Sequence, residues 1–240
     1  MRRAFVLTLF ATSALAAEPT MRRETRLEFA IDDAFQNDGG VQFFYEFFEP
    51  AQVADAGVGT DFARVRTLDD KATHGEQLHA VMSRIVYTLE RDITYFTEAR
   101  ARDVKYINTI APEVKATVDA KGVFHTSKPP ANSFTIEWQK PLREDSPYRA
   151  FLPAGAEIDS LIVQRNSDFD RMFGFKTAER AVTWTAHQPL GEGRTRVFVV
   201  TMSLMHNIPP GFMGGKERVY KEAVESATQL IGRLRNYKGP

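Results

Sequence analysis

Cysteine is absent from all 240 residues of the sequence, and this absence excludes several kinds of protein. No disulfide can form, no thiolate can act as a nucleophile, and zinc–thiolate and iron–sulfur centres have no ligands. Small exported domains with a weak core usually depend on disulfides. A chain of this length without them must be held together by its hydrophobic core alone, which is feasible for one domain or for two small ones.

The sequence also lacks an excess of charge of either sign. It contains 31 basic and 31 acidic residues, so no long-range field attracts it to nucleic acid or to an anionic membrane surface. Beyond the N-terminal segment, no apolar run reaches the roughly 20 residues that a membrane-spanning helix needs. We therefore predict no nucleic-acid partner and no transmembrane span in the mature protein.

The first residues have the three parts of a secretory signal peptide. Arg2 and Arg3 give a positive start, 4–15 is a short apolar stretch, and Ala14-Leu15-Ala16 is a small-x-small cleavage site. We predict that cleavage removes residues 1–17, or 1–16, and leaves a soluble bacterial protein in the periplasm or outside the cell. The mature chain, 18–240, is predicted to be a single α+β domain.

Alternating apolar residues predict a sheet in much of the mature chain. A turn of the type Asp119-Ala120-Lys121-Gly122 lies inside one expected hairpin, and Pro189-Leu190-Gly191-Glu192-Gly193 joins the last two expected strands. The predicted strands and hairpin lie at 24–31, 41–48, 113–127, 134–138, 161–164, 180–188 and 194–206.

Residues 76–110 support two interpretations. Leu78, Val81, Met82 and Ile85 recur at the spacing of an amphipathic helix. The same segment is rich in β-branched and aromatic residues and also alternates. We predict a helix over 76–92 with extended structure beyond Ile93, and keep a strand as the alternative.

The C-terminal helix has the clearest pattern in the chain. Its apolar stripe repeats every 3.6 residues, and basic residues gather near its end, where the helix dipole favours them. The helix is predicted over 216–235, with the stripe formed by Val219, Tyr220, Ala223, Val224, Ala227, Leu230, Ile231 and Leu234.

The last quarter of the chain resembles the end of the START-like helix-grip (SRPBCC) superfamily. The residues that carry the resemblance are the strands at 180–188 and 194–206, the Pro209-Pro210-Gly211 break and the final helix. The resemblance implies a curved antiparallel sheet wrapped around that helix. It also implies an apolar cavity between them for a lipid, sterol or polyketide.

None of the polar motifs predicts catalysis or a resident metal. His74 and His79 are five residues apart, whereas a zinc helix needs its histidines four apart. Asp168 and Asp170 have no third ligand nearby in the sequence, and the glycines before Lys216 lack the spacing of a phosphate loop. We predict no cofactor, no metal site and no catalytic residue, and leave open whether the protein is an enzyme.

A ligand pocket is instead predicted from aromatic residues on the expected strands. His206 and His187 are candidate polar groups, and Arg165 is another group suited to orienting a ligand. The predicted ligand-binding residues are Trp138, Trp184, Phe198, Met202 and His206.

The function that this pocket implies is binding of a small apolar ligand by an exported protein. Two alternatives stay open at this point. One is an envelope assembly or scaffolding protein with a protein partner and no small ligand. The other is a cyclase- or hydrolase-like enzyme, which would show convergent polar groups and a perturbed pKa in an enclosed cavity.

Overall fold

The structure is a computed structural model that describes residues 60–68, 78–127, 131–142, 144, 155–172, 175–176, 178–206, 225–226 and 229–239. Several segments discussed above lie outside these residues. They are the N-terminal segment, the strands expected at 24–31 and 41–48, His74, residues 76–77 and the start of the expected C-terminal helix.

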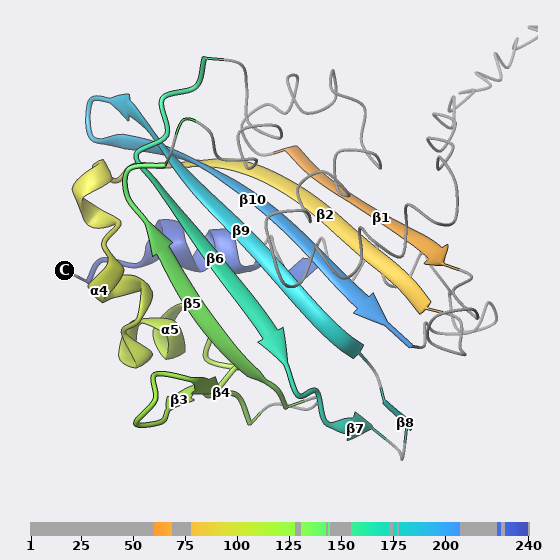
Figure 1. The fold of residues 1–240 in the computed structure, drawn as a ribbon. Helices are drawn as coiled ribbons and strands as arrows, with labels where there is room; N and C mark the ends of the chain where they lie inside the picture. The colour runs from red at the N-terminus through yellow and green to blue at the C-terminus, as the bar shows by residue number, and fades with distance from the viewer. Residues whose placement is uncertain are drawn as a thin grey trace, which may run out of the picture.

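An antiparallel sheet of eight strands forms the body of the described chain (Figure 1). Its strand order is β1-β2-β10-β9-β6-β5-β4-β3, and a separate two-stranded ribbon pairs β7 with β8. The strands are β1 (Thr60–Leu68), β2 (Leu78–Leu89), β3 (Thr117–Val118), β4 (Phe124–His125), β5 (Ser133–Gln139), β6 (Ser160–Ser167), β7 (Arg171–Met172), β8 (Phe175–Lys176), β9 (Ala178–Gly191) and β10 (Arg194–Met205).

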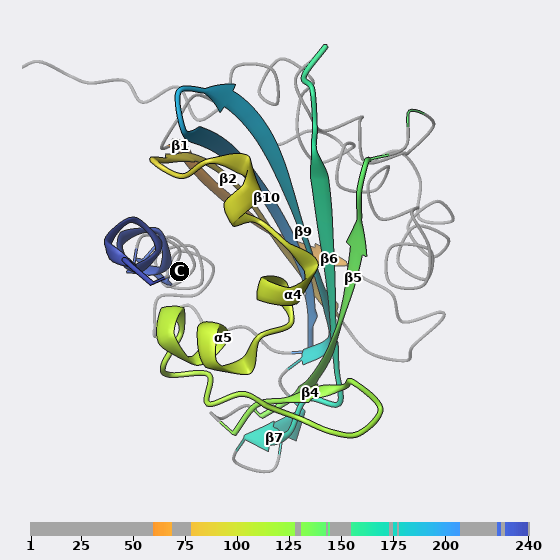
Figure 2. The ribbon, with the colours of Figure 1, turned by 90° about the vertical axis from the view of Figure 1, so that its left-hand side faces the viewer.

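The helices lie together on one side of the curved sheet (Figure 2). They are the short turn η1 (Ile93–Tyr95), α4 (Glu98–Ala101), α5 (Val104–Ile110) and a C-terminal helix that includes residues 229–236. Local capping explains where the short helices begin. Thr97 accepts from the amide of Arg100 at the start of α4, and Asp103 accepts from the amide of Lys105 at the start of α5.

The helix predicted over 76–92 is wrong, because this segment forms β2. The strand pairs along its length with β1 on one side and with β10 on the other. Val86, Tyr87 and Leu89 are all buried, so both faces are covered at the C-terminal end of this strand. A strand that is apolar on both faces loses its simple alternation, and its apolar residues then fit a helical spacing as well.

The extended structure predicted beyond Ile93 is also wrong, since η1, α4 and α5 occupy 93–110. Asp92, Thr97 and Asp103 each cap one of these helices with a side-chain oxygen. Three closely spaced capping residues are a helix-start signal, and they outweigh the β-branched composition here.

The other described predictions for the sheet and the final helix are confirmed. β9 and β10 form the C-terminal hairpin, whose turn places Gly191, Glu192 and Gly193 at positive φ. β3 and β4 form the hairpin expected within 113–127. Residues 229–236 are helical, and Ile231 and Leu234 of the predicted stripe are buried there. The α+β fold class, a curved antiparallel sheet packed on a C-terminal helix, is therefore confirmed.

Two hydrophobic clusters join the helices to the sheet. Tyr87, Leu89 and Val197 of the sheet pack against Ile231 and Leu234 of the C-terminal helix. The second cluster is centred on Phe124 and Phe134, whose rings stack with centroids 4.8 Å apart, and residues of α4 and α5 pack against it. The helices are thus fixed at two ends of the sheet, and a cavity lies between them.

Candidate ligand cavity

The cavity between the sheet and the helices has a volume of about 570 Å³. Its floor is the helix-facing side of β5, β6, β9 and β10, and its walls come from α4, α5 and the C-terminal helix. Most of the lining is apolar, with a few polar groups placed between. The floor residues are Phe134, Ile136, Trp138, Ile162, Gln164, Asn166, Thr183, Thr185, His187 and Val199.

His187 is the buried polar group at one end of the floor. It is 2% exposed, and its Nδ1 is hydrogen-bonded to Ser160 Oγ at 3.1 Å. The Phe96 ring stacks on the imidazole with centroids 4.3 Å apart, and the Trp138 ring lies 6.3 Å away. Burial lowers the pKa of His187 to about 3, against the opposing attraction of Asp159. The ring is therefore fixed in place and uncharged at neutral pH.

Three amide side chains form a chain of hydrogen bonds toward the other end of the floor. Gln164 Nε2 donates to Asn166 Oδ1 at 3.0 Å, and Asn166 Nδ2 donates to Asn132 Oδ1 at 2.8 Å. All three residues line the cavity. Because each amide is held by the next, their remaining donors and acceptors are presented in fixed directions.

Arg100 is the charged residue in the helical wall. Its guanidinium lies 3.8 Å from the centre of the Tyr95 ring, and its Nη1 donates to the Tyr95 carbonyl at 2.8 Å. The Tyr106 hydroxyl is 3.4 Å from that of Tyr95. Burial, and then the hydrogen bond to Tyr95, raises the pKa of Tyr106 above its usual range. The charge of Arg100 is thus already engaged by the protein.

Of the five predicted ligand-binding residues, the structure places Trp138 in the cavity. Trp184, Phe198 and Met202 are buried on the opposite face of the sheet. Neighbouring positions of β9 and β10, such as Thr185 and Val199, line the cavity instead, because successive side chains of a strand point to opposite faces. Trp184, Phe198 and Met202 are therefore not among the residues that line the helix-side cavity, and their part in ligand binding stays a prediction.

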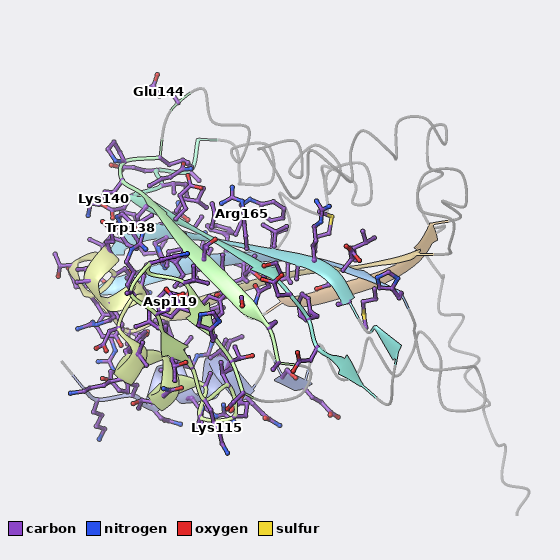
Figure 3. The ribbon with its side chains drawn as sticks, turned by 60° about the horizontal axis from the view of Figure 1, so that its bottom comes forward. Lys115, Asp119, Trp138, Lys140, Glu144 and Arg165 are labelled. Carbon is purple, nitrogen blue, oxygen red and sulfur yellow. The ribbon has the colours of Figure 1, made fainter. Side chains whose placement is uncertain are left out.

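His206 and Arg165 also lie away from the cavity. His206 Nε2 is 2.8 Å from Glu179 Oε2, and Arg165 Nη1 donates to Glu137 Oε2 at 2.8 Å. Figure 3 shows Arg165 on the side of the sheet away from α4 and α5. A second hollow of about 450 Å³, lined in part by Arg165 and Glu179, lies on that face. Arg165 and Glu179 are each paired with a neighbouring side chain, Glu137 and His206, in contrast to the mostly apolar lining of the main cavity.

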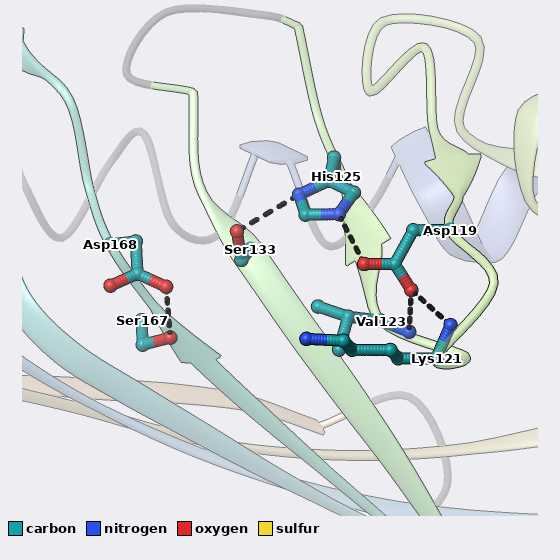
Figure 4. A network of polar contacts seen from close by, with 7 residues as sticks. All are labelled: Asp119, Lys121, Val123, His125, Ser133, Ser167 and Asp168. Atoms are coloured by element: carbon teal, nitrogen blue, oxygen red, sulfur yellow. Dashed lines mark hydrogen bonds and ion pairs between the residues drawn. The ribbon is translucent and has the colours of Figure 1, made fainter.

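A serine, a histidine and an aspartate also meet at the β3–β4 hairpin (Figure 4). His125 Nδ1 is 3.1 Å from Ser133 Oγ, and His125 Nε2 is 3.2 Å from Asp119 Oδ2. His125 and Ser133 are opposite each other in the β4–β5 pairing. Asp119 accepts from the amides of Lys121 and Val123, and these bonds, the one from Val123 first, lower its pKa.

This group fixes the hairpin turn and is not part of the cavity. The His125 side chain is 45% exposed, and neither His125 nor Ser133 lines the main cavity or the second hollow. A nucleophilic serine also needs a shielded pocket with donors for the oxyanion. Within the described residues, no group of three or more histidine and acidic side chains is arranged to hold a metal ion. No described helix is both long and apolar enough to span a membrane.

The amide chain of Gln164, Asn166 and Asn132 was not predicted from the sequence. Polar residues that alternate along a strand are typical of a solvent-facing side, and Gln164 and Asn166 fit that pattern. The available signal was their position two and four residues after Ile162, which lies on the same face of β6. Once Ile162 is known to face the cavity, Gln164 and Asn166 can be placed on the same face of the strand.

No protein-family model matches the sequence, and no curated protein matches it. Several solved structures are similar to it at low identity. A START superfamily protein from Mycobacterium smegmatis is 15% identical, with 65% of this chain and 94% of that chain covered at a TM-score of 0.43. The Zhui aromatase/cyclase from Streptomyces sp. R1128 is 13% identical, with 66% and 93% covered at a TM-score of 0.42.

The lipid transfer and protein localization domain of human StarD13 is 13% identical, with 77% of this chain and 88% of that chain covered at a TM-score of 0.36. The START-like resemblance predicted from the C-terminal quarter recurs among these matches. It is a likeness of fold alone.

Proposed function

We propose that this protein binds a small, largely apolar ligand in the cavity between the sheet and the helices. The observation that carries the proposal is the cavity itself, with about 570 Å³ of space and a mostly apolar lining. Ligand sites of this kind have volumes of about 300–1,000 Å³, with a few polar groups that fix orientation. Burial of apolar ligand surface would supply most of the affinity, at about 25 cal/mol per Å².

The ligand class proposed is a lipid-sized, sterol-like or polyketide-like molecule. The aromatic rings of Phe96 and Trp138 suit a ring system, and the hydrogen-bonding side chains of the floor suit its polar substituents. The cavity walls come from separate helices, α4, α5 and the C-terminal one, so displacement of any one of them would open a path for entry.

His187 favours binding over acid–base catalysis at this site. It has the burial and the perturbed pKa expected of an enzyme group, and for this reason a cyclase-like activity is the second candidate. A general acid or base works best when its pKa lies near the operating pH. Burial holds the pKa of His187 at about 3, so the ring is a weak base and is suited to hydrogen bonding a ligand.

We further propose that the protein acts outside the cytoplasm after removal of residues 1–17. The support is the charge, apolar stretch and cleavage site at the start of the sequence, together with the absence of cysteine. Expression of the full sequence in a bacterium, followed by fractionation and intact-mass measurement, tests this. A periplasmic protein that begins at residue 17 or 18 is expected, and a cytoplasmic protein that keeps Arg2 and Arg3 would overturn it.

The binding proposal is tested with the fluorescent apolar dye N-phenyl-1-naphthylamine. We expect the wild-type protein to bind the dye, and Thr185→Trp to abolish binding, because Thr185 lies on the cavity floor. Thr135→Trp is the matched control, since Thr135 is exposed on the opposite face of β5. Equal dye binding by both variants, or no binding by the wild type, would contradict the proposal.

Native mass spectrometry of the protein purified from its own host separates the remaining alternatives. A bound mass that organic solvent extracts supports a ligand carrier. A protein free of small molecules but held in a stable complex supports the scaffolding alternative. Conversion of an added ligand, detected in the extract, supports the enzyme.

A further inference from the structure

The floor of the cavity carries hydrogen-bonding groups at its two ends, with the large apolar side chains of Ile162 and Trp138 between them. The pairing of β5, β6 and β9 shows the arrangement. His187 is opposite Ser160, and Ile162 is then opposite both Trp138 and Thr185. Gln164 and Asn166 come two and four residues later on the same face of β6.

The distance between the two places follows from strand geometry. Ser160 and Gln164 are four residues apart on β6, which corresponds to about 13 Å along a strand. The band between them is formed by Ile162 and the two residues opposite it, Trp138 and Thr185, all of which line the cavity. A ligand that reaches both places must therefore be long and largely apolar in its middle.

The end near His187 is built for a flat ring. The imidazole is stacked on Phe96 with an angle of 30° between the planes, and Trp138 is tilted by 31° from the imidazole. Three rings close together favour offset stacking of a further ring over contact with a flexible chain. The imidazole of His187 adds hydrogen-bonding nitrogen atoms at this end, and its burial keeps the ring uncharged.

The other end offers an acceptor in a fixed position. Among the described residues, the Gln164 side chain makes its hydrogen bond through Nε2, which donates to Asn166 Oδ1. Gln164 Oε1 is thus left to accept from a ligand hydroxyl. The amide chain through Asn166 to Asn132 holds it in place.

The electrostatics of the lining disfavour an anionic ligand. Arg100 is the one cationic side chain among the described residues that line the cavity, and it is engaged by the ring and carbonyl of Tyr95. A carboxylate moved into this apolar space would lose its hydration without gaining a full ion pair.

We infer that the cavity selects an uncharged, flat ligand with hydrogen-bonding oxygens at both ends, and that His187 and Gln164 determine this specificity. The inference rests on the proposed function, since it names the ligand class of the same cavity. A fatty acid, with its charged head and flexible chain, fits neither end.

The test uses ligands that differ in one property, each measured by displacement of N-phenyl-1-naphthylamine. trans-Stilbene, 4-hydroxystilbene and 4,4′-dihydroxystilbene share one flat skeleton and differ in their hydroxyl groups, and oleate is the anionic comparison. We expect the dihydroxy compound to bind at least about tenfold more tightly than stilbene, because each buried polar group of the site then gains a partner. Oleate is expected to be the weakest competitor.

Gln164→Leu is expected to lower the affinity for 4,4′-dihydroxystilbene about tenfold and to leave stilbene unchanged. Gln139→Leu makes the same change on the opposite face of β5, where the side chain bonds Glu137, and should match the wild type. His187→Phe is expected to act like Gln164→Leu. Should that variant not fold, His187→Phe with Ser160→Ala removes both partners of the buried hydrogen bond and takes its place.

Equal affinity for the three stilbenes, or stronger binding of oleate, would overturn the inference. The proposed function would survive that outcome provided that the dye binds and Thr185→Trp abolishes its binding. Absence of dye binding in the wild type would instead overturn the proposed function itself, so the two failures are distinguishable.

Discussion

At the level of single residues, His187 links the stability of the protein to pH. Its neutral form is buried against Phe96 and bonded to the buried hydroxyl of Ser160. The nearby charges are Asp159 and Lys140, which form an ion pair with Lys140 Nζ 2.9 Å from Asp159 Oδ2. Because these two charges largely cancel, burial decides the protonation state of the ring.

The first prediction is that acid destabilises the protein through His187. The unfolded chain takes up this proton near pH 6.5 and the folded chain only near pH 3. The stability that the neutral ring contributes is therefore complete above pH 6.5 and is lost as the pH falls toward 3. We expect a loss of about 3 kcal/mol at most between pH 7 and pH 4, measured by urea unfolding at several pH values.

His187→Phe should remove most of that pH dependence, at a cost of about 1–2 kcal/mol at pH 7 because the Ser160 hydroxyl loses its partner. His125→Gln, on the exposed β3–β4 hairpin, is the matched control and should keep the dependence. If the free energy of unfolding of His187→Phe fell with pH as steeply as that of the wild type, another group would be responsible for the pH dependence.

At the level of elements, Asn108 connects α5 to the segment before β3. Its Nδ2 donates to the Ala116 carbonyl at 2.9 Å, and its Oδ1 accepts from the Ala116 amide at 2.6 Å. Ala116 is buried, so water cannot replace either bond. One side chain thus fixes the position of a helix that forms a wall of the cavity.

The second prediction follows from this two-point contact. Asn108→Leu leaves the amide and carbonyl of Ala116 without partners and should destabilise the protein by about 2–3 kcal/mol. Asn108→Asp keeps the acceptor and should cost less. Thr109→Ala, one residue along on the exposed face of α5, should change stability by no more than about 0.5 kcal/mol. Equal midpoints in urea for all three variants would refute the role of Asn108.

The elements also show what sequence patterns can and cannot predict. The C-terminal hairpin and helix were predicted because their apolar residues follow a single clear period, as do Phe134, Ile136 and Trp138 in β5. β2 was mistaken for a helix because its sequence is apolar at positions of both faces and because it pairs with β10, from a distant part of the chain. The pattern of residues within 78–89 gives no information about pairing with such a distant strand.

The same limit explains the candidate site. On β9 and β10 one face is buried and the residues that border the cavity are mostly half-buried, so alternation in the sequence defines two faces without saying which one borders the cavity. Trp184, Phe198 and Met202 were chosen because they are large, yet Thr183, Thr185 and Val199 line the cavity. β5 has one exposed face, and Trp138, on its other face, lines the cavity.

At the level of the whole molecule, an internal cavity makes stability depend on its occupant. The helices contact the sheet through two clusters at the margins of the cavity, and the space between them contributes no packing of its own. A ligand that fills this space binds the folded chain and not the unfolded one, so it stabilises by mass action.

The third prediction is a ligand-dependent melting temperature. At a concentration 100 times its Kd, a cavity ligand should stabilise the protein by about 2.7 kcal/mol, which corresponds to a rise of about 5–10 °C in Tm for a chain of this size. Differential scanning fluorimetry measures it. Thr185→Trp should lose the rise and Thr135→Trp should keep it; a rise of equal size in both would place the binding outside the cavity.

The alternation of β9 also has a consequence for engineering. Thr183, Thr185 and His187 border the cavity, whereas Val182, Trp184 and Ala186 between them are buried on the other face. A combinatorial library randomised at Thr183 and Thr185 would therefore vary the cavity lining while His187 and the three positions on the other face, which are buried, stay constant.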